Sequence, residues 1–443
     1  MSTRAAMRTR PHRTGGRRTA AVAAVAVLAL ALGACGDDQK NSQTGDVVGL
    51  TDTGGPKVNA GDCAGLKNGV GITDTKITIA NASDMSGFVP GLFKDAQQAV
   101  QAYVAYFNAG QDICGRKLEY LPLDSRLDAG GDQQAAQQAC EKAFAMVGSM
   151  AAFDSGGAPV VSGCKIPDLR VATLTPARLK SDVTFATNSL AVNQIPAAVP
   201  DYFLKNHHDA TQKAAFLYLN AGAALDNGKS AIAAYKKRGY KFIYEQAIDP
   251  LDVNYTPYIL AMKKKGVEYV QFIGDYNSAA RLAKVMAAQQ FKPEVYLLDP
   301  AGYDYKFIRL AGPAAEGTRI FINSALFEEA KSNDEMRRYM GWLQKVAPNA
   351  YPTYFGLFAW SSARLFTEQA IQLGGKLDRA TLLGALANVS EWDGHGLFAP
   401  MPVGKRETGG CTSIIRLESG KWVRESEGKF TCGPLIDSGY GAR

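Results

Sequence analysis

Short apolar runs alternate with longer helical patterns along most of this 443-residue chain. A first series begins with the apolar run at 77–80, and a helix is expected from about 92 to 108. A second series begins at 214–219, with an expected helix near 223–238. Alternation of this kind is typical of parallel sheets that carry helices on both faces. The sequence therefore predicts an α/β fold.

Two such series predict two doubly wound parallel-sheet lobes. About 380 residues follow the N-terminal segments, more than a single hydrophobic core usually contains. In sheets of this kind, ligands bind beyond the carboxyl ends of the strands. The loops that follow the strands are therefore where functional residues are expected.

The N-terminus has the charged and apolar parts of a secretory signal. Residues 1–18 contain six arginines and no acidic residue, and 20–32 is an unbroken run of small apolar residues. This run is shorter than the about 20 residues that span a bilayer. The sequence Leu-Gly-Ala-Cys at 32–35 then resembles the lipobox of bacterial lipoproteins. This resemblance implies cleavage before Cys35 and attachment of a diacylglycerol to its sulfur.

The N-terminal region is therefore divided into a signal peptide (1–34) and a lipidated Cys35 with a polar, flexible tether (35–70). An ordinary signal peptide with a chance cysteine and an uncleaved anchor remain the alternatives. Arg17 and Arg18 allow a twin-arginine export signal, which we rank below general secretion because the surrounding residues match it poorly.

Most of the positive net charge belongs to the expected signal peptide. The formal net charge is +7, and loss of residues 1–34 with their six arginines would leave +1. A nearly neutral mature chain gives no indication of nucleic-acid binding. The lipid chains would hold the protein at the outer face of the cytoplasmic membrane.

Cysteine usage agrees with export. Six cysteines follow Cys35, namely Cys63, Cys114, Cys140, Cys164, Cys411 and Cys432. An even number in an exported chain indicates disulfides. The sequence alone does not decide the pairing, but proximity in the expected fold favours Cys63–Cys114, Cys140–Cys164 and Cys411–Cys432. The lack of a Cys-x-x-Cys pair and the scarcity of histidine argue against a zinc site or a redox pair.

Three motifs suggest an enzyme, and each is incomplete. The run 154–157 resembles the nucleophile segment of trypsin-like proteases, but the only upstream histidine lies in the export signal. The run 222–230 places five residues between glycines where a phosphate-binding loop needs four. Carboxylate pairs at 124 and 128, or 249 and 252, lie in turn-like stretches where solvated carboxylates are common. We therefore expect no catalytic activity and no cofactor.

Several short segments carry a resemblance to a known family. They are Gly-Ile-Thr-Asp-Thr-Lys-Ile at 71–77, Asp-Met-Ser-Gly at 84–87, Phe-Asn-Ala-Gly at 107–110, Gly-Arg-Lys-Leu at 115–118 and Gly-Pro-Ala-Ala-Glu-Gly at 312–317. In order and spacing, from about residue 73 to 424, they resemble the type 1 periplasmic binding proteins of ABC importers. The resemblance is to the branched-chain amino-acid-binding branch, as found in actinobacterial lipoproteins.

The resemblance implies two lobes joined by three crossing segments, which we place near 184–188, 320–324 and 391–398. The first lobe would comprise 71–188 and 324–394, and the second 189–323 and 395–435. A ligand would bind in the cleft and stabilise a closed form that a permease recognises.

The same resemblance places ligand-binding residues in the loops after the strands. They are Ser86, Phe88, Ser149, Met150, Ala151, Phe153, Asp154, Thr173, Thr175, Leu225, Asp226, Asp275, Tyr276, Tyr303 and Tyr354. The loop at 148–155 takes the place of the one that binds a ligand carboxylate, and Asp275 lies near the acid that holds an ammonium group. We expect alanine at Asp275 or at Ser149 to weaken ligand binding with little loss of unliganded stability.

The run Met-Ala-Ala-Phe at 150–153 makes the carboxylate-binding loop less polar than the family's. This favours a larger apolar, aromatic or amide ligand over an α-amino acid. The expected protein is a monomeric solute-binding lipoprotein working with an ABC permease and ATPase. A ligand-sensing receptor subunit of the same fold, acting through a partner in trans, is the alternative, and an exported hydrolase ranks lower.

Overall fold

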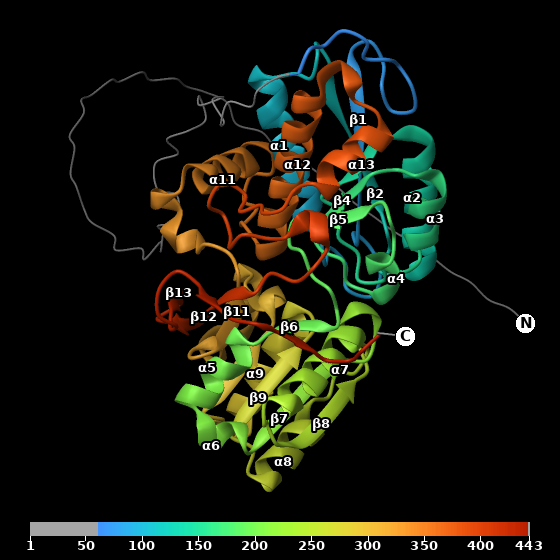
Figure 1. Ribbon diagram of the computed structural model, residues 1–443. Helices are drawn as coiled ribbons and strands as arrows, with labels where there is room; N and C mark the ends of the chain where they lie inside the picture. Colours follow the sequence, from blue (N-terminus) through green and yellow to red (C-terminus); the bar gives the residue numbers. More distant parts are fainter. Residues whose placement is uncertain (1–60, 442–443) are drawn as a thin grey trace, which may run out of the picture. The chain divides into compact units, whose positions relative to one another are not determined.

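The structure is a computed structural model in which residues 61–441 are described (Figure 1). The expected signal peptide, Cys35 and most of the expected tether lie outside the described residues. Two separate main sheets, each with its own helices, define what we call the first and the second lobe. A doubly wound α/β architecture of this kind confirms the predicted fold class. The lobe boundaries given above remain a prediction.

The first lobe is built on a five-stranded parallel sheet of order β2-β1-β3-β4-β5. Its strands are β1 (Lys76–Ser83), β2 (Lys117–Asp124), β3 (Ala145–Val147), β4 (Asp168–Arg170) and β5 (Thr184–Ala186). Its helices are α1 (Lys94–Gly110), α2 (Ala129–Lys142), α3 (Ala158–Cys164), α4 (Pro176–Leu179), α11 (Asp334–Val346), α12 (Tyr354–Leu373) and α13 (Arg379–Ala387).

Alternate residues of β1 face opposite layers, as expected for a strand buried on both sides. Ile77 and Ile79 belong to the core that contains α1 and α12. Ala80 and Ala82 belong to a smaller core that contains alanines of α2. The sheet therefore lies between two helical layers, and its strands lead into loops at one edge.

The second lobe is built on a larger sheet of order β13-β12-β11-β10-β9-β7-β8, with β14 paired to β12. Its strands are β7 (Ala214–Leu219), β8 (Phe242–Ile248), β9 (Tyr269–Ile273), β10 (Val295–Leu298), β11 (Arg319–Ile322), β12 (Cys411–Glu418), β13 (Lys421–Arg424) and β14 (Thr431–Cys432). Strands β7 to β11 are mutually parallel, whereas β12 is antiparallel to β11 and forms a hairpin with β13.

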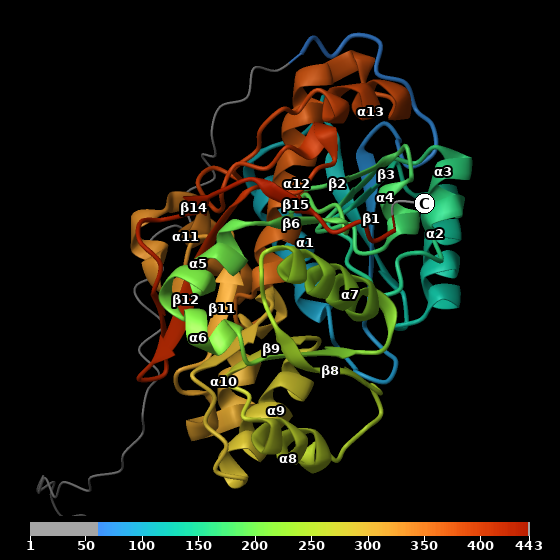
Figure 2. The same cartoon turned by 60° about the horizontal axis from the view of Figure 1, so that its bottom comes forward.

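The helices of the second lobe cover both faces of this sheet (Figures 1 and 2). They are α5 (Ala198–Asn206), α6 (His208–Thr211), α7 (Gly222–Lys237), α8 (Thr256–Lys265), α9 (Tyr276–Ala288) and α10 (Tyr305–Ala311). Short 3₁₀ helices lie at Pro300–Gly302, Gly312–Ala315, Phe327–Ser332, Gly374–Lys376 and Val403–Lys405. A separate two-stranded ribbon pairs β6 (Gln194–Pro196) with β15 (Leu435–Asp437) (Figure 2).

The disulfides join the cysteines in the pairs that proximity favoured. Cys63 bonds to Cys114, Cys140 to Cys164, and Cys411 to Cys432. The second of these links the last turns of α2 and α3, and the third links paired residues of β12 and β14. The structure confirms the three predicted pairings.

Candidate ligand-binding site

A cavity of about 230 Å³ lies where loops of both lobes meet. Its first-lobe wall includes Phe88, Leu92, Phe93, Leu127, Met150, Ala152, Phe153, Leu174, Tyr354 and Phe355. Its second-lobe wall includes Leu219, Ala223, Ala224, Asn227, Ile273, Asp275, Asp299 and Pro300. Apart from Tyr354 and Phe355, which begin α12, these residues lie at the ends of β1 to β4, β7, β9 and β10 or in the segments that follow them. The cavity therefore lies at the carboxyl ends of parallel strands, as is usual for this sheet type.

Asp84, directly after β1, fixes two pieces of the first-lobe wall. Its carboxylate accepts hydrogen bonds from the Ser125 hydroxyl (2.6 Å), the Leu127 N–H (3.0 Å) and the Ala152 N–H (2.8 Å). Burial raises the pKa of Asp84 to about 6 against the opposing effect of these bonds. Asp84 therefore positions Leu127 and Ala152 without itself lining the cavity.

Asp154 has a similar role in the loop that follows β3. It is fully buried and accepts hydrogen bonds from the Thr175 hydroxyl (2.6 Å) and the Leu174 N–H (2.9 Å). Arg170 and Arg178 lie beside it in a buried network of charges. Burial raises its pKa, and the two arginines oppose that rise. Asp154 thus holds Leu174 in the cavity wall.

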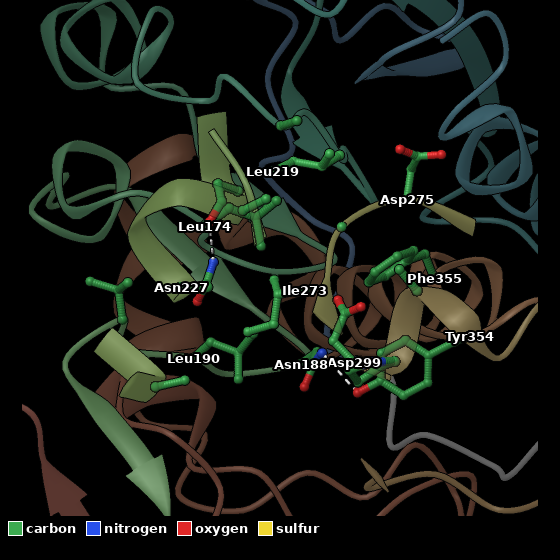
Figure 3. A pocket seen from close by; sticks show the side chains of 18 of the residues that line it. Leu174, Asn188, Leu190, Leu219, Asn227, Ile273, Asp275, Asp299, Tyr354 and Phe355 are labelled. Carbon is green, nitrogen blue, oxygen red and sulfur yellow. Dashed lines mark hydrogen bonds between the residues drawn. The ribbon is translucent and has the colours of Figure 1, made fainter. Parts of the chain in front are cut away.

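Asp275 lies at the second-lobe wall, but its oxygens are occupied by its own helix. It is the N-cap of α9: Oδ1 accepts from the N–H groups of Asn277 (2.8 Å) and Ser278 (3.1 Å), and Oδ2 accepts from the Ser278 hydroxyl (2.7 Å). Figure 3 shows its carboxylate pointing away from the other labelled side chains. The carboxylate of Asp275 therefore already accepts hydrogen bonds from the first turn of α9.

Asp299 is the carboxyl group that the sequence analysis missed. It directly follows β10 and lines the cavity close to Asn188 and Tyr354 (Figure 3). Burial raises the pKa of Asp299 to about 7, while backbone hydrogen bonds from Gly274 and Ala301 oppose the rise and nearby Asp275 adds to it. Its place immediately after the apolar run 295–298 is the sequence signal that could have identified it.

Three polar side chains form a closed ring of hydrogen bonds at one side of the cavity. Tyr354 donates to Asn323 Oδ1 (2.6 Å), Asn323 donates to Asn188 Oδ1 (3.0 Å), and Asn188 donates to the Tyr354 oxygen (3.1 Å). Asn188 follows β5 and Asn323 follows β11, so the ring joins two chain segments that run between the lobes. The sequence analysis named only Tyr354.

The predicted site residues divide into those that line the cavity and those that do not. Phe88, Met150, Phe153, Asp275 and Tyr354 line it. Outside the lining are Ser86, Ser149, Ala151, Asp154, Thr173, Thr175, Leu225, Asp226, Tyr276 and Tyr303. A role in binding remains a prediction for both groups.

Several residues outside the lining have partners elsewhere. Ser86 donates to Asp124 (2.6 Å), Thr173 donates to the Leu190 carbonyl (2.6 Å), and Asp226 accepts from Tyr440 (2.6 Å). Tyr303 is buried, donates to Glu328 (2.9 Å) and stacks on Phe327. Tyr276 lies against the ammonium group of Lys306.

The structure corrects the expectation that alanine at Asp275 or Ser149 leaves unliganded stability nearly unchanged. Asp275 caps α9, and Ser149 is fully buried with its hydroxyl oxygen accepting from the Ala82 N–H (3.0 Å). Removal of either side chain leaves buried backbone N–H groups without their acceptor, which costs stability.

Two further features of the described residues concern metal binding and membrane crossing. Within residues 61–441, no group of three or more His, Cys, Asp or Glu side chains is placed to hold a metal ion. Over the same residues, no helix has the length and apolar character needed to cross a bilayer.

Comparison with known proteins identifies the family of this chain. A model of the periplasmic binding protein family matches residues 76–419. A search of curated proteins found no match.

Solved structures share the fold at low identity. A leucine binding protein, LivK, from Thermotoga maritima MSB8 is 15% identical, with a TM-score of 0.68 over 82% of this chain and 99% of that one. A fatty acid ABC transporter substrate-binding protein from Thermomonospora curvata is 19% identical, with a TM-score of 0.71 over 85% and 96%. A solute binding protein from R. palustris in complex with 4-hydroxybenzoate is 15% identical, with a TM-score of 0.67 over 82% and 97%.

The fold thus agrees with the family match. This chain belongs to the periplasmic binding protein family and has its type 1 fold, so it is a binding protein rather than an enzyme.

Proposed function

We propose that this protein is an extracytoplasmic solute-binding lipoprotein that captures a small molecule between its lobes and delivers it to an ABC permease. The cavity formed jointly by both lobes carries this proposal. A ligand that contacts both walls stabilises the closed arrangement over an open one, and a membrane partner can distinguish the two.

Direct contacts between the lobes support this mechanism. The Ala223 N–H, at the start of α7, donates to the carbonyl of Ala152 in the loop after β3 (2.9 Å). Lys306 of α10 forms an ion pair with Asp95 of α1 (3.4 Å). Both contacts join elements of different lobes, and a ligand that touches both walls would add to them.

The ligand class follows from the cavity walls, most of which are apolar side chains. An apolar or aromatic compound, or an amide, suits these walls better than a zwitterionic amino acid, whose two charges would both need partners. Structures of the same fold include a fatty acid ABC transporter substrate-binding protein and a solute binding protein in complex with 4-hydroxybenzoate, which supports an aliphatic or aromatic ligand on this fold.

Anchoring completes the proposal. Cys35 carries the lipid that holds a monomeric binding protein at the outer face of the cytoplasmic membrane, near its permease and ATPase. Substitution Cys35→Ser should shift the protein from the membrane fraction to the soluble fraction of cells that export it. Retention of the serine variant in the membrane fraction would contradict the lipid anchor.

A thermal-shift screen of the purified protein tests the binding function. The panel contains amino acids, amides, sugars, aromatic acids and aliphatic compounds, and a true ligand raises the melting temperature as its concentration rises. Ala224→Trp, which fills the cavity from α7, should abolish the shift. Ala287→Trp, at an exposed position of α9, serves as the matched control and should retain it. A shift that survives Ala224→Trp would place the ligand outside this cavity.

A further inference from the structure

The cavity extends beyond the meeting of the two lobes into the second lobe. Its lining there includes Ile195 of β6, Val199 of α5, Tyr235 of α7 and Phe321 of β11. These residues belong to the core, or pack against the core, that α5 and α7 form over one face of the second-lobe sheet. We call this extension the second-lobe arm.

The walls of the second-lobe arm are mainly aliphatic and aromatic. Ala231 and Val199 are buried there. Gln271 is a polar residue of this wall: its Oε1 accepts a hydrogen bond from the hydroxyl of Tyr269 (3.0 Å), and its buried Nε2 has no hydrogen-bond partner among the described residues. Burial of each methylene group in such surroundings is favourable, whereas a charged group would lose its hydration. The arm therefore suits an aliphatic chain.

The charges around the cavity are of one sign. Among the described residues that line it, none is Lys, Arg or His, and the ionisable acids are Asp275 and Asp299. Asp275 is committed to the N-terminus of α9 by three hydrogen bonds. The Asp299 carboxylate also accepts backbone hydrogen bonds, from Gly274 and Ala301, but an ionised carboxylate has acceptor sites left for a ligand. Unlike Asp275, whose carboxylate points away from the other labelled side chains, Asp299 lies beside Tyr354 and Asn188 (Figure 3).

We propose that the ligand is an elongated aliphatic compound whose head is a non-anionic hydrogen-bond donor, such as an amine or an alcohol. The head donates to Asp299 and the chain occupies the second-lobe arm. This inference rests on the proposed function and names the substrate class of the same cavity.

Electrostatics in an apolar cavity favours such a head over a carboxylate. An anionic ligand would bring a further negative charge next to Asp299 without any basic side chain to balance it, whereas an ammonium group would pair with it. The titratable groups facing Asp299 are Asp275 of α9, Tyr296 of β10 and Tyr354 of α12. Since burial already raises the pKa of Asp299 to about 7, pairing with a cation should weaken as the pH falls below 7.

Calorimetric titration of the full protein with decylamine, decanol and decanoate tests the head group. At pH 8, below the micellar concentration of each compound, decylamine should bind at least tenfold more tightly than decanoate. Between pH 8 and pH 6 the affinity for decylamine should fall, while both ligands keep their own charge. Equal or tighter binding of decanoate would overturn the proposal.

Two variants distinguish a direct contact between Asp299 and the ligand head from the general effect of removing one negative charge. Asp299→Asn should bring the affinities for decylamine and decanoate to within about threefold of each other. Asp249→Asn removes one negative charge from an exposed loop of the same lobe, where Asp249 accepts from the Leu251 N–H (2.8 Å), and should keep the preference. An unchanged preference in Asp299→Asn would overturn the role of Asp299.

A chain-length series tests the second-lobe arm. From butylamine to decylamine, affinity should rise roughly fourfold per methylene, the value expected for burial of a methylene group. Ala231→Leu narrows the arm and should reduce that increment to below twofold for the longer amines. An affinity independent of chain length would overturn the arm.

If no aliphatic compound binds but another compound of the thermal-shift panel does, this inference fails and the proposed function stands. If nothing in that panel binds, the proposed function fails.

Discussion

At the scale of the residue, Asp299 shows how an apolar cavity changes the behaviour of a carboxyl group. Its folded-state pKa of about 7 lies above its ordinary value of 3.8, so the folded protein favours the protonated form. Stability contributed by this preference is present below pH 4 and is lost as the pH rises to about 7. Asp299→Asn should therefore melt about 2–4 °C above the parent protein at pH 8 and close to it at pH 4.5, as calorimetry can measure. A difference that stays constant across this range would contradict the raised pKa.

At the scale of the element, Asp275 determines how α9 begins, and therefore how one wall of the cavity is held. Asp275→Ala removes the acceptor of two helix N–H groups and should lower the free energy of unfolding by about 1 kcal/mol. Asp275→Asn keeps a good N-cap oxygen and should lose much less. Urea denaturation of the two variants measures the difference. Equal losses in both would show that the charge of Asp275, rather than its capping oxygen, stabilises the helix.

At the scale of the whole molecule, the ion pair between Lys306 and Asp95 connects the lobes across the cleft. Lys306→Gln should weaken closure and accelerate ligand dissociation by roughly three- to tenfold, consistent with about 1 kcal/mol for a partly buried pair. Burial raises the pKa of Asp95 to about 6 despite the attraction of Lys306, so the effect of the substitution should shrink below pH 6. Stopped-flow displacement measures the rate. Lys284→Gln, at an exposed position of α9, is the control, and an equal acceleration there would exclude a specific contact.

Much of the fold was predictable because its signals are local. The apolar run at 77–80 lies within β1, that at 214–219 is β7, and the helix expected at 92–108 is α1 shifted by two residues. A strand buried on both faces and an amphipathic helix each leave a periodic pattern in the chain. Phe88, Met150 and Phe153, which the family resemblance placed in loops after strands, line the cavity, and their role in binding remains a prediction.

The candidate site was less predictable because its polar groups depend on partners far away in the sequence. Asp275 and Asp299 each follow an apolar strand, and nothing local distinguishes them. The structure shows that Asp275 caps α9, whereas Asp299 accepts backbone hydrogen bonds from Gly274 and Ala301 and lies beside Asn188 and Tyr354 at the cavity. Asn188 and Asn323 are 135 positions apart and meet only because two interlobe segments run side by side.

The sequence by itself therefore determined the α/β architecture, the family and several of the loops that line the cavity. The spacing of apolar residues shows which face of a strand or helix is buried, and this spacing can be seen within each segment alone. The tertiary structure alone decided the extent of the cavity and the different orientations of the two carboxyl groups that line it, Asp275 and Asp299. Ile195, Tyr235 and Phe321 form the second-lobe arm through packing of elements distant in the chain, and long-range packing leaves no periodic trace in any one segment.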